Sequence, residues 1–96
     1  MVKIVITEIY LLKLQDQANY ISRDKPIATL KFRRDLIRNI KKDLKYPFHY
    51  KKSVYCDDEN RRDYVFKGYT SVFEVEPKKD LVTVFGFIKH MENLQL

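Results

Sequence analysis

The chain has 96 residues, of which 45% are hydrophobic and 14% aromatic, a composition that excludes a disordered protein. One modest core fits this length, so we expect a single domain over residues 1–96. The formal net charge is +6, and no apolar run is long enough to predict a transmembrane helix. Glu8 lies where the apolar core of a signal peptide would be, so we expect a cytoplasmic protein.

A short strand and a helix are predicted at the start of the chain. Residues 2–6 alternate in the manner of a half-buried strand. Thr7 is a good N-cap, and the negative charge of Glu8 suits the first turn of a helix. Apolar residues then recur at helical spacing, at Leu11, Leu14, Ala18 and Ile21, and predict a helix of about four turns.

A second helix is predicted from Pro26 to Lys45, after a link so short that the two helices must form a hairpin. Asp24 can cap its start. Tyr46 ends it, because the residue before a proline is pushed out of the helical region. The apolar residues of this helix share one side, which we expect to pack on a sheet: Leu30, Leu36, Ile37, Ile40 and Leu44.

Positive charge is concentrated in residues 31–52, which hold nine Lys or Arg against two Asp, a net charge of +7, so the rest of the chain carries −1. This basic face indicates a polyanionic partner, either nucleic acid or an acidic protein segment, although many charge runs are only solvated. Arg33 lies inside the apolar stripe instead, so it must reach solvent or pair with an acid such as Asp63 or Glu74. The basic arc of the helix comprises Lys31, Arg34, Arg38, Lys41, Lys42 and Lys45.

The second half of the chain is predicted to consist of strands joined by turns. The clearest feature is a hairpin over residues 62–75, which turns at Lys67 and Gly68 because glycine tolerates a positive φ. Residues 47–53 are predicted as a loop, 54–56 as the start of a strand, and 57–60 and 77–80 as turns. Residues 81–88 are predicted as a strand buried on both faces. The order predicts an α+β domain, with an N-terminal strand and a helical hairpin packed on a twisted, mainly antiparallel sheet.

The order and spacing of these features resemble the RelE/ParE superfamily of bacterial type II toxins over nearly the whole chain. This resemblance implies a small growth-inhibiting toxin, of the kind found in toxin-antitoxin and plasmid-stabilisation systems, which a cognate antitoxin neutralises by wrapping an extended segment around it. The residues that carry it are Tyr20-Ile21, Asp24-Lys25-Pro26, Ala28, Phe32, Leu36, Ile40, Leu44, Pro47, Arg62-Asp63, Lys67-Gly68-Tyr69 and the last strand running into His90.

Two targets remain open under this resemblance. The RelE-like branch is similar to ribosome-dependent mRNA endonucleases, whereas the ParE-like branch poisons DNA gyrase without known hydrolysis. Many members have an arginine in the last strand where this chain has Phe87 or Gly86, and the helical hairpin looks more like the ParE branch, so gyrase is favoured. A non-toxic basic nucleic-acid-binding module is a third interpretation. A nuclease would need an acid, a base and cations at the phosphate, roles open to His90, Arg62, Lys51 and Lys52.

Several candidates also have ordinary structural explanations. His90 could be a surface or capping histidine, Arg62 could form an exposed ion pair with Asp58 or Glu59, and Tyr69 could belong to the core. His49 is assigned no role. The lone Cys56 and the two histidines predict neither a disulfide nor a metal site, and we expect no cofactor. The candidates for contact with nucleic acid or the antitoxin are Lys31, Arg34, Arg38, Lys41, Lys45, Lys51, Arg61 and Tyr69.

Overall fold

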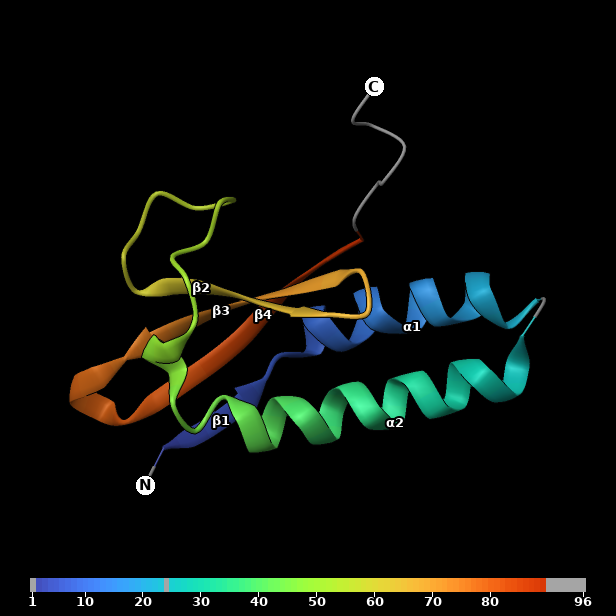
Figure 1. The fold of residues 1–96 in the computed structure, drawn as a ribbon, viewed down its shortest axis with the longest axis horizontal. Helices are drawn as coiled ribbons and strands as arrows, with labels where there is room; N and C mark the ends of the chain where they lie inside the picture. The colour runs from blue at the N-terminus through green and yellow to red at the C-terminus, as the bar shows by residue number, and fades with distance from the viewer. Residues whose placement is uncertain (1, 24, 90–96) are drawn as a thin grey trace.

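The computed structural model describes residues 2–23 and 25–89, with the side chains of residues 21 and 22 excepted. Within this range the chain forms an α+β domain, as predicted, in which a helical hairpin packs on one face of a four-stranded sheet (Figure 1). The elements are β1 (Lys3–Ile6), α1 (Glu8–Ser22), α2 (Pro26–Asp43), β2 (Arg61–Phe66), β3 (Tyr69–Glu76) and β4 (Leu81–Lys89), with 3-10 helices at Pro47–His49 and Pro77–Lys79. No helix in the described part of the chain is both long and apolar enough to cross a membrane.

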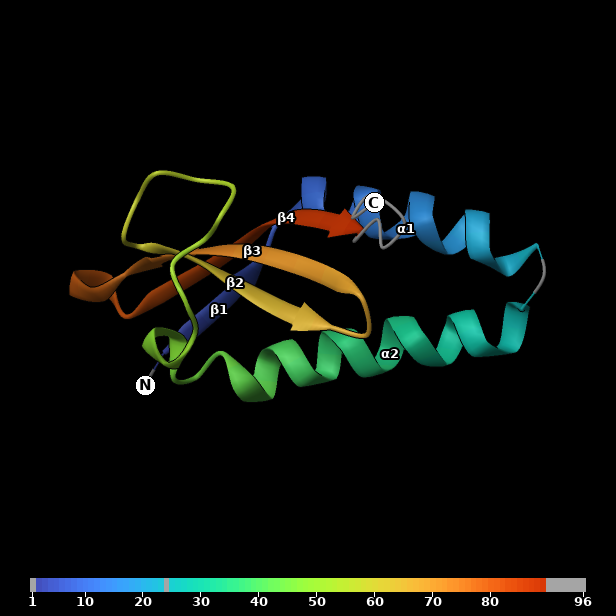
Figure 2. The same cartoon turned by 45° about the horizontal axis from the view of Figure 1, so that its top comes forward.

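The sheet is mixed, with strand order β1-β4-β3-β2. The three strands of the second half are antiparallel, as expected for a mainly antiparallel sheet. β1 instead runs parallel to β4, and its residues Lys3 to Ile6 pair with Leu81 to Val84. The strand that begins the chain therefore lies beside the strand that ends the fold (Figure 2).

Thr7 joins β1 to α1 as predicted. Its hydroxyl accepts a hydrogen bond from the Tyr10 backbone N–H at 3.1 Å and donates one to the Val84 carbonyl at 3.1 Å. Leu14 and Ala18 are buried, whereas Leu11 is 43% exposed. The buried side of α1 is centred instead on Tyr10, which is fully buried. The side chain of Ile21 lies outside the described residues.

The second helix begins at Pro26 as predicted and ends at Asp43, two residues before the predicted end. The Leu44 N–H still bonds to the Ile40 carbonyl, and the chain leaves helical geometry before Pro47. The predicted cap, Asp24, lies outside the described residues. Leu36, Ile40 and Leu44 are buried, whereas Leu30 is 67% exposed and its predicted burial is wrong. The first turns of α2 extend beyond the β2–β3 turn, so no strand lies over them (Figure 1).

The predicted hairpin is present, with Phe66 opposite Tyr69. Both turn residues have positive φ, 49° at Lys67 and 83° at Gly68, which is the type I′ geometry that matches the twist of a two-residue hairpin. β3 is buried on both faces, with consecutive buried residues from Thr70 to Phe73. The helices cover one face, and the segment after the first 3-10 helix covers part of the other.

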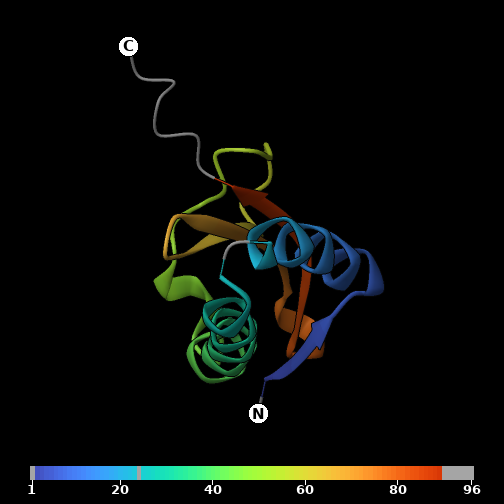
Figure 3. The same ribbon diagram turned by 90° about the vertical axis from the view of Figure 1, so that its right-hand side faces the viewer.

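The strand predicted to begin at residues 54–56 is absent, because this segment is an irregular part of a long loop. The predicted turns at 57–60 and 77–80 and the last strand are present. Val82 and Val84 are buried on the helix side, while Phe85 is only partly buried on the other. The main core gathers between the helices and the sheet (Figure 3); it comprises Tyr10, Leu14, Leu36, Ile40, Leu44, Tyr64, Phe73, Val75, Val82 and Val84.

Candidate functional site

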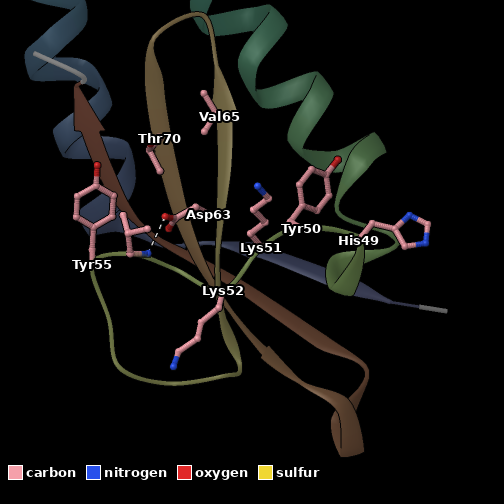
Figure 4. Close-up of a pocket in the computed structure, with 9 residues that line it drawn as sticks. His49, Tyr50, Lys51, Lys52, Tyr55, Asp63, Val65 and Thr70 are labelled. Atoms are coloured by element: carbon pink, nitrogen blue, oxygen red, sulfur yellow. Dashed lines mark hydrogen bonds between the residues drawn. The ribbon is translucent and has the colours of Figure 1, made fainter. Parts of the chain in front are cut away.

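A pocket of about 490 Å³ lies between the long loop and the β2–β3 hairpin (Figure 4). Its walls combine aliphatic and aromatic side chains with cations and one carboxylate. Tyr50 and Lys51 lie on one side of Asp63 and Tyr55 on the other, while Lys52 and His49 extend outward. The lining residues are His49, Tyr50, Lys51, Lys52, Val54, Tyr55, Asp63, Val65 and Thr70.

The loop that forms this pocket is attached to the edge of β2. Lys52 makes an isolated antiparallel bridge to Arg62. The Ser53 N–H donates to the Arg61 carbonyl at 2.8 Å, and the Asp63 N–H donates to the Lys51 carbonyl at 3.2 Å. These bonds fix the backbone of residues 51–53 beside β2, so Lys51 and Lys52 are held next to the hairpin.

Asp63 has an unusual environment in this pocket. One carboxylate oxygen accepts a hydrogen bond from the Val54 N–H at 3.1 Å. The other oxygen is buried and has no hydrogen-bond partner, and such an acceptor usually has a partner in folded proteins. Asp63 therefore holds the loop and also adds an unsatisfied acceptor to a pocket that is otherwise rich in cations.

Arg62 holds the two ends of the loop together. Its Nη1 donates to the Tyr50 carbonyl at 2.8 Å and its Nε donates to the Glu59 carbonyl at 2.9 Å. The guanidinium also lies over the Phe48 ring, 4.9 Å from the ring centroid. The predicted ion pair with Asp58 or Glu59 side chains is absent. Because its Nε and Nη1 donors are bonded to backbone carbonyls, Arg62 has a structural role in this conformation. We call it the clasp of the loop, since it joins the two ends.

The other nuclease candidates do not converge on one point. The Lys52 ammonium lies 3.4 Å from the Asp57 carboxylate, and both groups are exposed. Lys51 lines the pocket. His90 lies outside the described residues. Of the candidates named here, the described residues therefore place only Lys51 and Lys52 at the pocket.

The family resemblance includes an arginine in the last strand, aligned with Gly86 or Phe87 of this chain. Neither position carries a cation. Phe87 stacks on Tyr69, with ring centroids 5.2 Å apart and an angle of 8° between the planes, and it also meets Tyr10 edge to face. A Cβ atom added at Gly86 would lie 3.0 Å from the Val72 Cβ. An arginine at Gly86 would therefore displace Val72, and at Phe87 it would break the aromatic stack.

Tyr69 and Arg61, two predicted binding residues, are used within the fold. Tyr69 also packs on Phe32, with ring centroids 5.1 Å apart, which supports its core role over base stacking. Arg61 pairs with Glu74 at 2.9 Å and lies over the Phe85 ring. The hydrogen bond to Glu74 is the main cause of its raised pKa, and a weaker bond to the Cys56 thiol adds to it.

Neither of the two acids considered as partners for Arg33 pairs with it. Glu74 is paired with Arg61, and Asp63 bonds to the Val54 N–H. The Arg33 Nε is buried in the half-buried side chain and has no hydrogen-bond partner. Asp35, in contrast, is buried next to the basic arc and binds Arg38 at 2.9 Å, with the Arg34 Nε 3.7 Å away.

The basic arc of α2 and the pocket are separate surfaces. Lys31, Arg34, Arg38, Lys41 and Lys45 are all exposed, as predicted; the first four lie on the outer side of α2, and Lys45 follows two residues after its end. Lys51, by contrast, lines the pocket beside β2. The chain therefore presents two candidate contact regions, of which only the basic arc was read from the sequence.

Three tyrosines have shifted pKa values. Burial raises the pKa of Tyr10 to about 12, against the opposing effect of its hydrogen bond to Ser71. Burial also raises the pKa of Tyr50 in the pocket, with a further contribution from the Asp43 charge. Burial raises the pKa of Tyr64, and so does the hydrogen bond that its hydroxyl donates to the Asp43 carboxylate at 2.5 Å. The Tyr50 hydroxyl therefore stays protonated at neutral pH and is a poor general base.

Most of the pocket was not predicted from the sequence. His49 ends the first 3-10 helix, Tyr50 and Tyr55 come from the irregular loop that follows it, and Val65 was assigned only to a strand. Within the described residues, no group of three or more His, Cys, Asp or Glu could hold a metal ion. No protein-family model matches the chain, and no curated protein matches it.

Proposed function

We propose that this chain is a growth-inhibiting toxin of the RelE/ParE type, neutralised by a cognate antitoxin in a type II toxin-antitoxin system. The observation that carries the proposal is the arrangement β1-α1-α2-β2-β3-β4 with the helical hairpin on one face of the sheet, the architecture that the sequence resemblance implies. A shared fold supports this function only by analogy. The exposed basic arc supports it further, because an acidic antitoxin segment could cover it.

The favoured target is DNA gyrase, which the protein would inhibit by binding and without hydrolysis. Three observations support a binder. Arg62 is bonded to two backbone carbonyls, Phe87 is part of an aromatic stack, and Gly86 lies against Val72. A target in the nucleoid or on the ribosome would require a cytoplasmic protein.

The alternative is a ribosome-dependent mRNA endonuclease, and the pocket is the observation that favours it. His49, Lys51, Lys52 and Tyr55 line a hollow that could admit a nucleotide, and His90 could join them. The lysines could stabilise a charged phosphate, and a histidine could transfer a proton. A non-toxic basic nucleic-acid-binding module is the remaining reading.

The first test is expression of the chain alone in a bacterial host, with and without the product of the adjacent gene. We expect growth arrest that the neighbouring protein relieves. Phe73→Asp, which introduces a charge at a fully buried position, supplies the unfolded control. Normal growth with abundant folded protein would contradict the proposal.

A second test separates the two targets by what appears first after induction. Gyrase-trapped DNA breaks with arrested replication support the binder, whereas cleaved ribosome-bound transcripts support the nuclease. For a nuclease, Lys52→Ala and His90→Ala should each reduce cleavage by roughly 10²- to 10⁴-fold. Lys78→Ala, on the exposed turn between β3 and β4, is the matched control.

A further inference from the structure

The outer side of α2 carries two exposed aliphatic side chains in line with its basic residues. Ile27 is 83% exposed and Leu30 is 67% exposed. At about 100° per residue they point in the same direction as Arg34 and Lys41. We define the α2 outer face as Ile27, Leu30, Lys31, Arg34, Arg38 and Lys41, together with Lys45, which follows two residues after the end of the helix; all seven residues are exposed.

The charge on this face is only partly neutralised from within the chain. Arg34 and Arg38 share the carboxylate of Asp35. Lys31, Lys41 and Lys45 form no ion pair with any residue that the structure describes. The face therefore has an apolar end at the start of α2 and unpaired positive charge along the rest of the helix.

We propose that the α2 outer face docks an acidic amphipathic helix of a protein partner. Its length matches a helical ligand, since the 18 residues of α2 span about 27 Å. Ile27 and Leu30 offer exposed apolar surface that the aliphatic end of such a ligand would bury. Carboxylates farther along the ligand would pair with Lys31, Lys41 and Lys45. This inference names the partner's chemistry and holds whether or not the chain is toxic.

The two aliphatic residues are what favour a protein over nucleic acid. A phosphate backbone is bound by cations and hydrogen-bond donors and would gain nothing from Ile27 and Leu30. A second copy of this chain fits poorly, because two such faces would set lysine against lysine in one orientation and lysine against an aliphatic side chain in the other.

The test measures the affinity of the purified chain for labelled probes of three kinds, the two peptides having the same charge. The first is a helical peptide with leucines at one end and glutamates along the same side. The second is this peptide with its leucines replaced by glutamine, and the third is a DNA oligonucleotide, used single- and double-stranded. We expect the amphipathic peptide to bind about tenfold more tightly than the glutamine peptide, because its leucines become buried.

Two sets of variants assign the contacts. Ile27→Gln with Leu30→Gln should remove that tenfold preference and leave the affinity for the glutamine peptide unchanged. Lys31→Gln, Lys41→Gln and Lys45→Gln should flatten the salt dependence for both peptides. Ile9→Gln, at a 62% exposed isoleucine on α1, should change neither. Arg38 is retained because Asp35 depends on it.

Three results would overturn the proposal. Tighter binding of the oligonucleotide that ignores Ile27 and Leu30 would identify a nucleic-acid surface. Equal affinity for the two peptides, or no binding to either, would leave a solvated basic helix. Self-association that disappears in the Ile27→Gln, Leu30→Gln variant would make the occupant a second copy. Growth assays are independent of these measurements, so loss of the proposed toxicity would not affect them.

Discussion

At the residue scale, charged side chains in this fold hold the backbone as often as they face a partner. Arg62 bonds to carbonyls at both ends of the loop, and Asp63 fixes the Val54 N–H. Neither role is visible in the sequence, where both residues look like exposed charges of a strand. The pocket depends on these contacts, because they determine where residues 50–60 lie.

Replacing Arg62 with alanine should release the loop and lower the free energy of unfolding by about 1.5–3 kcal/mol, the usual range for hydrogen bonds that involve a charged group. Amide hydrogen exchange at Ser53 and Asp63 should accelerate, as measured by NMR. Lys51→Ala is the control, since only the backbone of Lys51 bonds to β2. Unchanged exchange in Arg62→Ala would show that the clasp contributes nothing.

Tyr10 gives the fold a pH dependence at high pH. Because its pKa is raised in the folded state to about 12 from the usual tyrosine value of 10.0, its contribution to stability is present below pH 10 and is lost as the pH rises towards 12. The loss should be on the order of 2 kcal/mol, and Tyr64 should add to it in the same direction. In Tyr10→Phe, chemical denaturation should show a smaller decline over this interval. An equal decline in both proteins would show that other titrating groups, including lysines, cause this loss of stability.

At the element scale, local sequence patterns predicted the helices and strands. They did not predict which part of each element is buried by the rest of the fold. The capping Thr7, the proline at the start of α2 and the Lys67-Gly68 turn act within a few residues, so the sequence alone indicated them. Leu30 was predicted to pack on the sheet because a helical projection says nothing about where a helix extends beyond its sheet. The pocket could not be predicted, because Tyr50 and Tyr55 reach it through an aperiodic loop.

Lys67 is a poor residue for its place in the hairpin turn. Its φ of 49° is disfavoured for most side chains, while asparagine tolerates it well and Asn-Gly is a preferred type I′ pair. Lys67→Asn should therefore raise the free energy of unfolding by about 0.5–1 kcal/mol, seen as a higher Tm. Lys78→Asn, at an exposed residue whose φ is not positive, should give no gain. A lower Tm for Lys67→Asn would mean that the cation over the Phe66 ring matters more than the backbone.

At the scale of the whole molecule, the parallel pairing of β1 with β4 closes the fold. Ile4 and Ile6 pack against the core beside Val82 and Val84. The Lys3 N–H bonds to the Asp80 carbonyl at 2.8 Å, and the Thr7 N–H bonds to the Val84 carbonyl at 3.0 Å. The sequence predicted β1 as a strand, but its partner depends on a contact between residues far apart in the chain.

A variant that begins at Thr7 should lose cooperative unfolding, because β4 would lose its hydrogen-bonded neighbour and the core two isoleucines. Thermal denaturation followed by circular dichroism measures this. Ile4→Val with Ile6→Val keeps the strand and should cost roughly 1–3 kcal/mol in total, from about 0.5–1.5 kcal/mol for each change. A sharp transition at nearly the original temperature in the shortened chain would show that β1 is dispensable.

The hydrogen bond between Thr7 and Val84 joins residues separated by 77 positions, and this has a consequence for translation. A ribosome adds about 5–20 residues each second, so the first strand waits several seconds before its neighbour exists. During that interval the nascent chain can form the helical hairpin but not the complete sheet. Folding of this domain is therefore finished only once β4 has been synthesised, and a chain stalled before β4 should remain an incomplete, protease-sensitive intermediate.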